Sequence, residues 1–216
     1  VFAVGITGMK YFQKLGFSES RLVNFPICVE TDENIPVYLA RREEIYSKLS
    51  IFNNNFVLSA GSRIIYDKGY DLLIKSIAHL NNEIREKIKV IIVGSGSCVP
   101  DLEKLITDLS LEKQIVLVKW LAIEDFKAVI ANSDVFIHPA RLDSYGGTTL
   151  GMALGVPVIG SYQAGAAVDR IVHGVNGYLY EADDIQSLAS FITLLYQSSD
   201  LRKKMALEAR KTALQW

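Results

Sequence analysis

Basic side chains and a glycine-rich turn form the strongest chemical signal in this sequence. The segment SRIIYDKG (62–69) holds Arg63 and Lys68, and the segment DSYGGTT (143–149) places Gly146 and Gly147 where a helix is expected to begin. Arginine binds a phosphate as a fork and lysine binds it as a point charge, while free N–H groups at a helix start attract anions. The pattern favours a phosphorylated ligand. The residues alone leave a second interpretation open, in which the glycines only permit a tight turn and Arg63 pairs with a surface carboxylate.

Further residues that could contact such a ligand lie elsewhere in the chain. His138 could donate a hydrogen bond to a phosphate or a sugar hydroxyl, or it could be a satisfied, half-buried histidine. Trp120 could stack on a base or cap the sheet, and Glu181 could reach the ligand or be a solvated loop carboxylate. Tyr162 and Gln163 follow the segment PVIGS and could also contact the ligand. The complete set of predicted binding residues, beside Arg63, Lys68 and Asp143, is Gly94, Gly96, Trp120, Leu121, His138, Ser144, Tyr145, Gly146, Gly147, Thr148, Thr149 and Gly151.

An alternation of strands and helices begins at Phe56 and must position these residues. The predicted strands are apolar on both faces and rich in β-branched residues, as parallel strands are; they read FVLSAG, KVIIVG, IVLVKW, DVFIHPA, PVIGS and GYLYE. Apolar residues at helical period predict helices over 70–80, 100–109, 124–131, 147–154, 166–172, 184–197 and 199–213. This alternation predicts an α/β fold with a Rossmann-like, doubly wound parallel sheet flanked by helices. Ligands of such sheets bind beyond the carboxyl ends of the strands, where the strand order reverses.

The first fifty residues have a different pattern. VFAVG predicts a short buried strand, MKYFQKLG predicts a short helix that ends at Gly16, and Pro26 interrupts an extended segment. A further helix is predicted over 37–49. These pieces are too few to enclose a hydrophobic core alone. We therefore expect residues 1–50 to be the end of another domain with a linker, and residues 51–216 to form the sheet domain.

The composition argues against several classes of protein. The net charge is −1, and no basic run of the kind that binds nucleic acid is present. No apolar run reaches the roughly 18 residues that a membrane span requires. Cys28 and Cys98 are far apart and lack metal-ligand spacing, so we expect neither a disulfide framework nor a metal site, and a reducing, cytoplasmic compartment. The start VFAVGITG has no methionine and no signal-peptide pattern, which suggests part of a larger protein.

Four segments resemble the retaining GT-B glycosyltransferases of family 4, the group 1 glycosyltransferases. They occur in the family's order and spacing, and they read SRIIYDKG, IIVGSGSCVPDLEKLI, SDVFIHPARLDSYGGTTLGMALGVPVIGS and DRIVHGVNGYLYEADD. The resemblance as a whole extends over about 56–213. The resemblance implies the C-terminal, donor-binding half of a GT-B fold, with most of the N-terminal acceptor domain missing. It also implies a UDP- or GDP-sugar donor, no required metal or other cofactor, and a saccharide or lipid-linked acceptor. Peripheral membrane contact would come through the absent domain.

The resemblance also assigns roles to individual residues. Arg63 and Lys68 would hold the diphosphate of the nucleotide, and the 146–149 turn would give it backbone N–H groups. Asp143 stands where the family commonly has the first glutamate of an E-x7-E pair, which contacts the transferred sugar. Gly151 stands where the second glutamate, which binds the ribose hydroxyls, is expected. Three interpretations of this glycine are open: a weakened donor affinity with the ribose held by another residue, a degenerate enzyme, or an altered residue in this chain. A fourth is that a small residue is needed there for close helix packing. If the donor site is only weakened at the ribose, glutamate at 151 should tighten donor binding about tenfold or more.

Three functions remain open at the level of the sequence. The first is transfer of a sugar from a nucleotide-sugar to an acceptor with retention of anomeric configuration; this chain alone would bind the donor without turning it over. The second, suggested by Gly151, is a non-catalytic nucleotide-binding or interaction module. The third is a nucleotide-sugar epimerase on the same scaffold. The base, the sugar and the acceptor do not follow from the residues.

Overall fold

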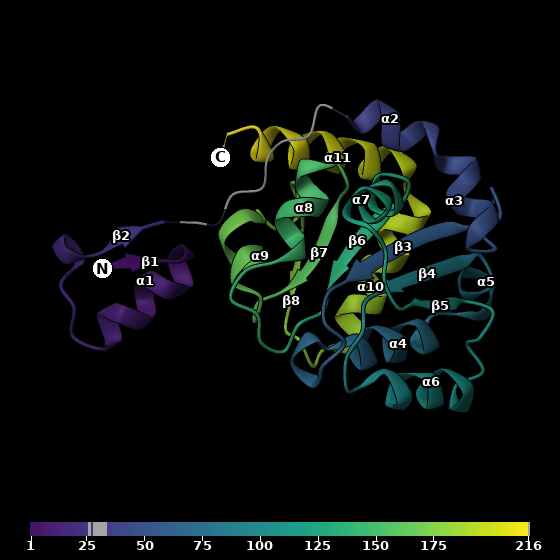
Figure 1. The fold of residues 1–216 in the computed structure, drawn as a ribbon, viewed down its shortest axis with the longest axis horizontal. Helices are drawn as coiled ribbons and strands as arrows, with labels where there is room; N and C mark the ends of the chain where they lie inside the picture. Colours follow the sequence, from purple (N-terminus) through teal and green to yellow (C-terminus); the bar gives the residue numbers. More distant parts are fainter. Residues whose placement is uncertain (26, 28–33, 216) are drawn as a thin grey trace.

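A parallel, six-stranded sheet forms the body of the molecule (Figure 1). The computed structural model describes residues 1–25, 27 and 34–215. The strands, in chain order, are β3 (Phe56–Gly61), β4 (Ile88–Val93), β5 (Ile115–Val118), β6 (Val135–His138), β7 (Val158–Ser161) and β8 (Gly177–Tyr180). The spatial order is β5-β4-β3-β6-β7-β8, so the direction of winding reverses between β3 and β6. This order confirms the predicted doubly wound sheet, and it places the expected ligand region beyond the ends of β3 and β6.

Helices cover both faces of the sheet. One face packs against α4 (Tyr70–His79), α6 (Val99–Asp108) and α10 (Ile185–Gln197). The other packs against α7 (Ile123–Ala131), α8 (Gly147–Ala153) and α9 (Gly165–Arg170), and α11 (Ser199–Ala213) contributes to both. The sequence predicted these helices to within a few residues, but not the short α5 (Asn82–Arg85), which Asn81 caps by accepting a hydrogen bond from the Ile84 N–H.

Burial on both faces explains why the strands read as continuous apolar runs. In β4, IKVIIV, all six residues are buried. Leu58 of β3 lies opposite Val90 of β4 on one side and Val135 of β6 on the other. Because successive side chains alternate between faces and both faces are covered, apolar residues predominate in the strands. Ser59 of β3 and Lys89 of β4 are buried exceptions, and most polar residues of the sheet domain lie beyond the strand ends.

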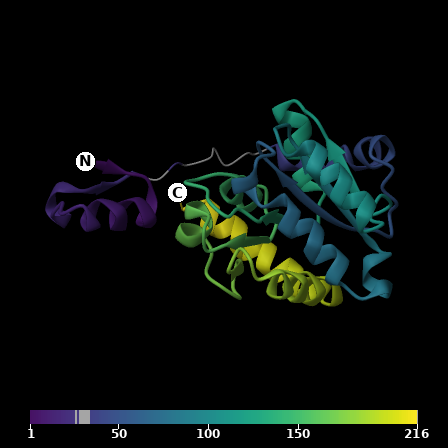
Figure 2. The same ribbon diagram turned by 90° about the horizontal axis from the view of Figure 1, so that it is seen from below.

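The first residues form a small βαβ unit beside the sheet domain (Figures 1 and 2). Strand β1 (Phe2–Ala3) pairs in parallel with β2 (Val23–Asn24), and α1 (Gly5–Lys14) connects them. The Ile6 N–H donates to Asp169 Oδ1 of α9 at 2.9 Å. The strand predicted at 1–5 spans only Phe2–Ala3, because α1 begins at Gly5, and within it Ala3 is buried whereas Phe2 is 73% exposed. The predicted interruption at Pro26 lies outside the described residues.

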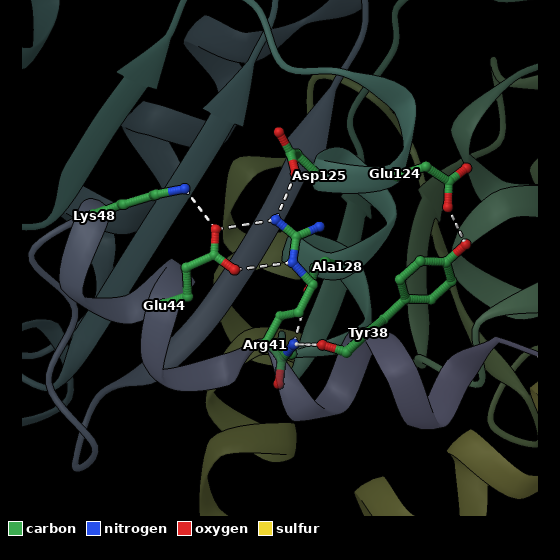
Figure 3. Close-up of polar contacts among 8 residues, drawn as sticks. Tyr38, Arg41, Glu44, Lys48, Glu124, Asp125 and Ala128 are labelled. Atoms are coloured by element: carbon green, nitrogen blue, oxygen red, sulfur yellow. Dashed lines mark hydrogen bonds and ion pairs between the residues drawn. The ribbon is translucent and has the colours of Figure 1, made fainter.

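The predicted helix over 37–49 is wrong in one respect, because it is two helices. α2 (Ile35–Ala40) and α3 (Arg42–Lys48) meet at a turn at Arg41. This turn lets both helices contact α7: Arg41 pairs with Asp125 at 2.6 Å, and the Tyr38 hydroxyl donates to Glu124 at 2.5 Å (Figure 3). Residues 35–48 therefore pack on the sheet domain. The division of the protein at residue 50 stays a prediction.

We expect buried hydrogen bonds, rather than the ion pairs of Figure 3, to hold α2 on the sheet domain. Asn132 is 5% exposed, and its Nδ2 donates to the Tyr38 carbonyl at 2.7 Å and the Ala128 carbonyl at 2.9 Å. Asn132→Ala should lower the free energy of unfolding by about 2 kcal/mol, because it leaves the buried Tyr38 carbonyl without its hydrogen-bond donor. Arg41→Ala, which removes partly exposed ion pairs, should cost less than about 1 kcal/mol. Urea unfolding compares the two, and equal losses would contradict this assignment.

Candidate functional site

The two segments that carry the predicted catalytic residues meet at the reversal of strand order. Residues 62–69 follow β3, and residues 139–149 follow β6, the neighbouring strand in the sheet. Gly69 has φ 66°, and a Cβ atom built there would lie 2.0 Å from the Pro139 carbonyl oxygen. A side chain at 69 would hold the two segments apart. Glycine at this position therefore lets them touch.

A buried network joins the predicted residues of the two segments. Lys68 Nζ lies 2.8 Å from Asp143 Oδ2, and the two side chains are 10% and 8% exposed. His138 Nε2 lies 3.0 Å from the same oxygen, and His138 Nδ1 lies 2.8 Å from Thr148 Oγ1. A carboxylate only accepts hydrogen bonds, so Nε2 donates to Asp143, and in the neutral ring Nδ1 accepts from the Thr148 hydroxyl. His138 thereby connects the carboxylate to the first turn of α8.

The electrostatics of this network favour an ionised Asp143. Burial alone would raise the pKa of its carboxyl group, but the hydrogen bonds from His138 and Lys68, together with the positive charge of Lys68, outweigh burial and hold the pKa below its usual value. The charge of Lys68 is thus balanced inside the protein. A ligand would meet Lys68 as one half of an ion pair and not as an isolated cation.

The turn before α8 presents backbone to the rim and turns its threonines inward. Thr148 and Thr149 are 0% and 2% exposed. The Thr149 hydroxyl donates to the Gly146 carbonyl at 3.0 Å. A Cβ atom at Gly147 would lie 2.6 Å from Phe136 Cζ, so only glycine lets α8 begin this close to the sheet. The threonine hydroxyls are engaged inside the protein, which leaves backbone N–H groups as the donors that this turn could offer an anion.

A second group of predicted residues lines an open hollow of about 490 Å³ beyond the ends of β3, β4 and β5. Arg63 and Lys119 supply two exposed cations, while Trp120 and Leu121 supply apolar surface. Trp120 is 77% exposed, so it does not cap the sheet. Within the described part of the chain, the Arg63 guanidinium has no hydrogen-bond or ion-pair partner. The alternative in which Arg63 pairs with a surface carboxylate is therefore not seen.

The glycines of the GSGS turn support the loop that carries Arg63. Gly94 and Gly96 have φ 153° and 159°, and Cβ atoms there would lie 1.9 Å from the Ser62 carbonyl oxygen and 2.2 Å from that of Ile64. The Ile64 N–H donates to the Ser95 carbonyl at 2.8 Å. These glycines let two loops pack backbone to backbone. Gly94 also lines the hollow, whereas Gly96 lies against Ile64.

The structure corrects the prediction for Gly151. This residue is buried in α8, and a Cβ atom there would lie 3.0 Å from Val158 Cγ2 and 3.1 Å from Phe136 Cβ. Position 151 therefore points into the sheet and not toward the rim. The prediction that this position faces a ribose is wrong, and close helix packing, the alternative raised above, explains the glycine.

The remaining predicted residues lie around the ends of β6, β7 and β8. The Tyr145 hydroxyl accepts a hydrogen bond from Arg170 Nε at 2.9 Å, and Ser144 is exposed. Gln163 Nε2 donates to Glu181 at 2.7 Å, and Tyr162 is 47% exposed. Sequence reasoning missed the role of Lys119, although it directly precedes Trp120. It also missed two interacting pairs at the rim, Ser62–Tyr70 and Asp71–Arg141. Tyr70 and Asp71 lie within a predicted helix, and Arg141 is distant from Asp71 in the sequence.

Three further observations concern the described residues. No three histidine, cysteine, aspartate or glutamate side chains among them converge in a way that could hold a metal ion. No helix in residues 1–25 or 34–215 is long and apolar enough to cross a membrane. Cys98 carries a free thiol, while Cys28 lies outside the described residues.

Comparison with known proteins decides the family. The family model described as "Glycosyl transferases group 1" matches residues 41–212, most of the chain. The chain belongs to the group 1 glycosyltransferases. The match begins at Arg41, between α2 and α3, so it includes α3 as well as the 62–69 and 139–149 segments.

Individual glycosyltransferases and a solved structure are also similar to this chain. The chain is 29% identical to the capsular polysaccharide biosynthesis glycosyltransferase CapM of Staphylococcus aureus, over 91% of this chain and 49% of CapM. It is 26% identical to a GDP-mannose-dependent phosphatidylinositol monomannoside mannosyltransferase of Mycolicibacterium smegmatis, over 90% of this chain and 53% of that protein. The crystal structure of Anabaena HepE with UDP-glucose superimposes with TM-score 0.86 at 25% identity, over all of this chain and 58% of HepE. The chain spans about half the length of the curated relatives it matches.

Proposed function

We propose that this group 1 glycosyltransferase chain binds the nucleotide-sugar donor for transfer of a sugar to a saccharide or lipid-linked acceptor. The observation that carries the proposal is the placement of Arg63, Lys68 and the 146–149 turn at the reversal of strand order, where doubly wound sheets bind ligands. HepE, a structural neighbour, was crystallised with UDP-glucose, and one relative is named for GDP-mannose. A UDP- or GDP-sugar is thus the proposed donor, and residues 51–216 the proposed donor domain.

The arrangement suggests a division of labour during transfer. When the bond between sugar and diphosphate breaks, negative charge builds up on the leaving phosphate. Arg63 and Lys68 would stabilise this charge, because fixed cations act most strongly on charge that develops in the transition state. No metal would be required. Asp143 is bound to Lys68 and His138 through Oδ2, so Oδ1 would be the atom that orients a sugar hydroxyl.

In this proposal the hollow beside Arg63 takes the base. Trp120 and Leu121 offer apolar surface, and Lys119 adds a second cation at its edge. Tyr162, near the end of β7, would face the sugar or the acceptor. Acceptor-binding groups would come from an N-terminal domain outside this chain. Retention of anomeric configuration, membership of family 4 and a cytoplasmic location belong to the same proposal and rest on the resemblance.

The alternative of a non-catalytic module loses its main support. It was motivated by a carboxylate thought to be lost at position 151, but that position faces the sheet. The epimerase alternative has no observation in its favour. Transfer is therefore the function that the site supports best.

The decisive experiment is calorimetric titration of the protein at its natural full length with UDP, GDP, ADP and their common sugar conjugates. One nucleoside diphosphate should bind with micromolar affinity, and its sugar conjugate should be consumed only when an acceptor is present. NMR of the product then reports the anomeric configuration. Absence of binding to every nucleotide at millimolar concentration would refute the proposal. Epimerised donor without an acceptor would favour the epimerase instead.

Arg63→Gln tests the role of the exposed cation. We expect the Kd for the preferred nucleoside diphosphate to rise between about tenfold and a hundredfold, since a charged hydrogen-bonding group typically contributes 1.5–3 kcal/mol. The melting temperature should stay unchanged because Arg63 has no partner within the described residues. Lys113→Gln is the matched control: it removes one exposed cation at the amino end of β5. Equal affinities of the two variants would show that Arg63 does not contact the diphosphate.

A further inference from the structure

We propose that Arg141 is a positioning residue, which together with Asp71 holds the Lys68 segment against the Asp143 segment in the geometry that binds a diphosphate. This inference rests on the proposed function and adds a residue pair to it. Sequence order suggests Arg141 as another cation for the ligand, because it follows β6 near Asp143. The structure indicates a different role, because the guanidinium already donates hydrogen bonds to Asp71 and to the Tyr66 carbonyl.

The side chain of Arg141 is held by Asp71 and Tyr66, and its Nε also lies 3.7 Å from Asp183 Oδ1. Its Nη1 and Nη2 donate to the two oxygens of Asp71 at 2.7 and 2.8 Å, a bidentate pair. Nη1 also donates to the Tyr66 carbonyl at 3.1 Å, and the guanidinium lies 4.2 Å from the centre of the Tyr66 ring. Arg141 is 15% exposed and Asp71 is 26% exposed. Such planar, two-bond pairs define geometry as well as energy.

These contacts bracket Lys68 in the sequence. Tyr66 lies two residues before Lys68, and Asp71 lies three residues after it, in the first turn of α4. Between them, the Asp67 carbonyl accepts from the backbone N–H groups of Arg141 at 2.7 Å and of Leu142 at 3.0 Å. The short segment that carries Lys68 is thus attached to the 141–142 segment at three points. The Lys68–Asp143 pair, the Gly69 contact and the backbone hydrogen bond from Ile64 to Ser95 hold the same segment at other points.

The partner side of the clamp is equally constrained. Asp143 follows Arg141 by two residues, and its backbone N–H donates to the Gln163 carbonyl at 3.1 Å. Its own carbonyl accepts from the Gly165 N–H at 2.9 Å. Loss of Arg141 would therefore free the Lys68 segment more than the Asp143 segment. The distance from Lys68 Nζ to a bound phosphate is the quantity that the clamp controls.

The electrostatics agree with a permanent clamp. Burial alone would raise the pKa of Asp71. The hydrogen bonds from Arg141 and Lys75 outweigh this effect and lower the pKa below its usual value, so the carboxyl group stays ionised. Lys75 reaches Asp71 at 3.0 Å from the next turn of the same helix. It therefore shares the carboxylate without connecting the two segments. Substitution of Lys75 is therefore a control, because it removes one ion pair of Asp71 and leaves the contacts between Arg141 and Asp71 in place.

The test compares a nucleoside diphosphate with its nucleoside in the natural full-length protein. Affinities for UDP and uridine, and for GDP and guanosine, are measured by calorimetry in the wild type and in Arg141→Lys, Asp71→Asn and Lys75→Met. Lysine keeps the charge at 141 but loses the fork and the stacking on Tyr66. The preference for the preferred diphosphate over its nucleoside should fall about tenfold in Arg141→Lys and Asp71→Asn. It should be unchanged in Lys75→Met.

The ratio of the affinity for the diphosphate to the affinity for its nucleoside distinguishes a positioning role from a general loss of structure. Loss of structure would weaken the diphosphate and the nucleoside alike and leave their ratio intact, and that result would overturn the inference. Asp71→Asn preserves side-chain size, so it carries the test if Arg141→Lys fails to fold. A wild type that binds no diphosphate more tightly than its nucleoside would refute the proposed function as well. A wild-type preference that survives in both variants would refute the clamp alone.

Discussion

Gly151→Glu should unfold or severely destabilise the protein, and it should not raise the affinity for a nucleotide. A Cβ atom at 151 already lies 3.0 Å from Val158 Cγ2 and 3.1 Å from Phe136 Cβ. The rest of the glutamate would enter the apolar space between α8 and the sheet, beside Val158 and Phe136. Overpacking costs about 1–3 kcal/mol, and an unpaired buried carboxylate adds several more. We expect a loss of at least about 4 kcal/mol, close to the whole stability of many domains.

Gly151→Ala is the matched control for this prediction. Alanine adds only the Cβ atom, and its better helix propensity, worth about 1 kcal/mol, offsets the tight contacts with Val158 and Phe136. Urea unfolding of both variants should therefore give a near-neutral alanine and a strongly destabilised glutamate. A folded glutamate variant with normal stability and about tenfold tighter UDP or GDP binding would restore the ribose interpretation.

The error at Gly151 shows what a sequence pattern leaves undetermined. Apolar periodicity predicted α8, and the count of residues from Asp143 suggested a role for position 151. Neither fixes the rotation of a seven-residue helix about its axis. That rotation is set by Phe136, Val158 and the glycine at 147, which allows the helix to begin against the Phe136 ring. Neighbouring residues of a helix point about 100° apart around its axis. A shift of one residue therefore decides whether a side chain faces the rim or the core.

The sheet itself could be predicted because its physics is local. Parallel strands buried on both faces need unbroken apolar runs, so β3 and β4 stand out in the sequence. Strand order is also constrained, since crossovers are right-handed and neighbouring elements pack together. In contrast, the helix predicted over 37–49 bends at Arg41 because of contacts with α7, more than 80 residues later. Tertiary contacts of this kind leave no periodic signal.

The two predicted phosphate-binding cations illustrate the same limit at the site. From the sequence, Arg63 and Lys68 looked equivalent. In the structure, Arg63 is exposed, whereas Lys68 is buried beside a carboxylate 75 positions away in the chain. Only the reversal of strand order between β3 and β6 brings Lys68 and Asp143 together. Their different surroundings predict different consequences of mutation, in binding for Arg63 and in both binding and stability for the Lys68 pair.

Asp143→Asn should reduce stability at neutral pH, even before any substrate is added. The substitution leaves Lys68, 10% exposed at its side chain, as a buried cation without its carboxylate. Breaking one side of a buried ion pair typically costs about 3 kcal/mol or more. A residue that only oriented a sugar would give a different result, because its replacement would reduce turnover and leave unfolding unchanged. Chemical unfolding at pH 7 distinguishes the two roles directly.

The pH dependence of that loss identifies its origin. The pKa of Asp143 is lowered in the folded protein, so its contribution to stability is present above the unfolded pKa of about 3.9. It disappears as the pH falls through the lower, folded value. The difference in unfolding free energy between wild type and Asp143→Asn should therefore be constant from pH 7 to about pH 5 and shrink below about pH 4. Lys68→Met in the Asp143→Asn background should recover part of the loss, since it removes the stranded charge; an unchanged or larger loss would place the counter-ion of Lys68 elsewhere.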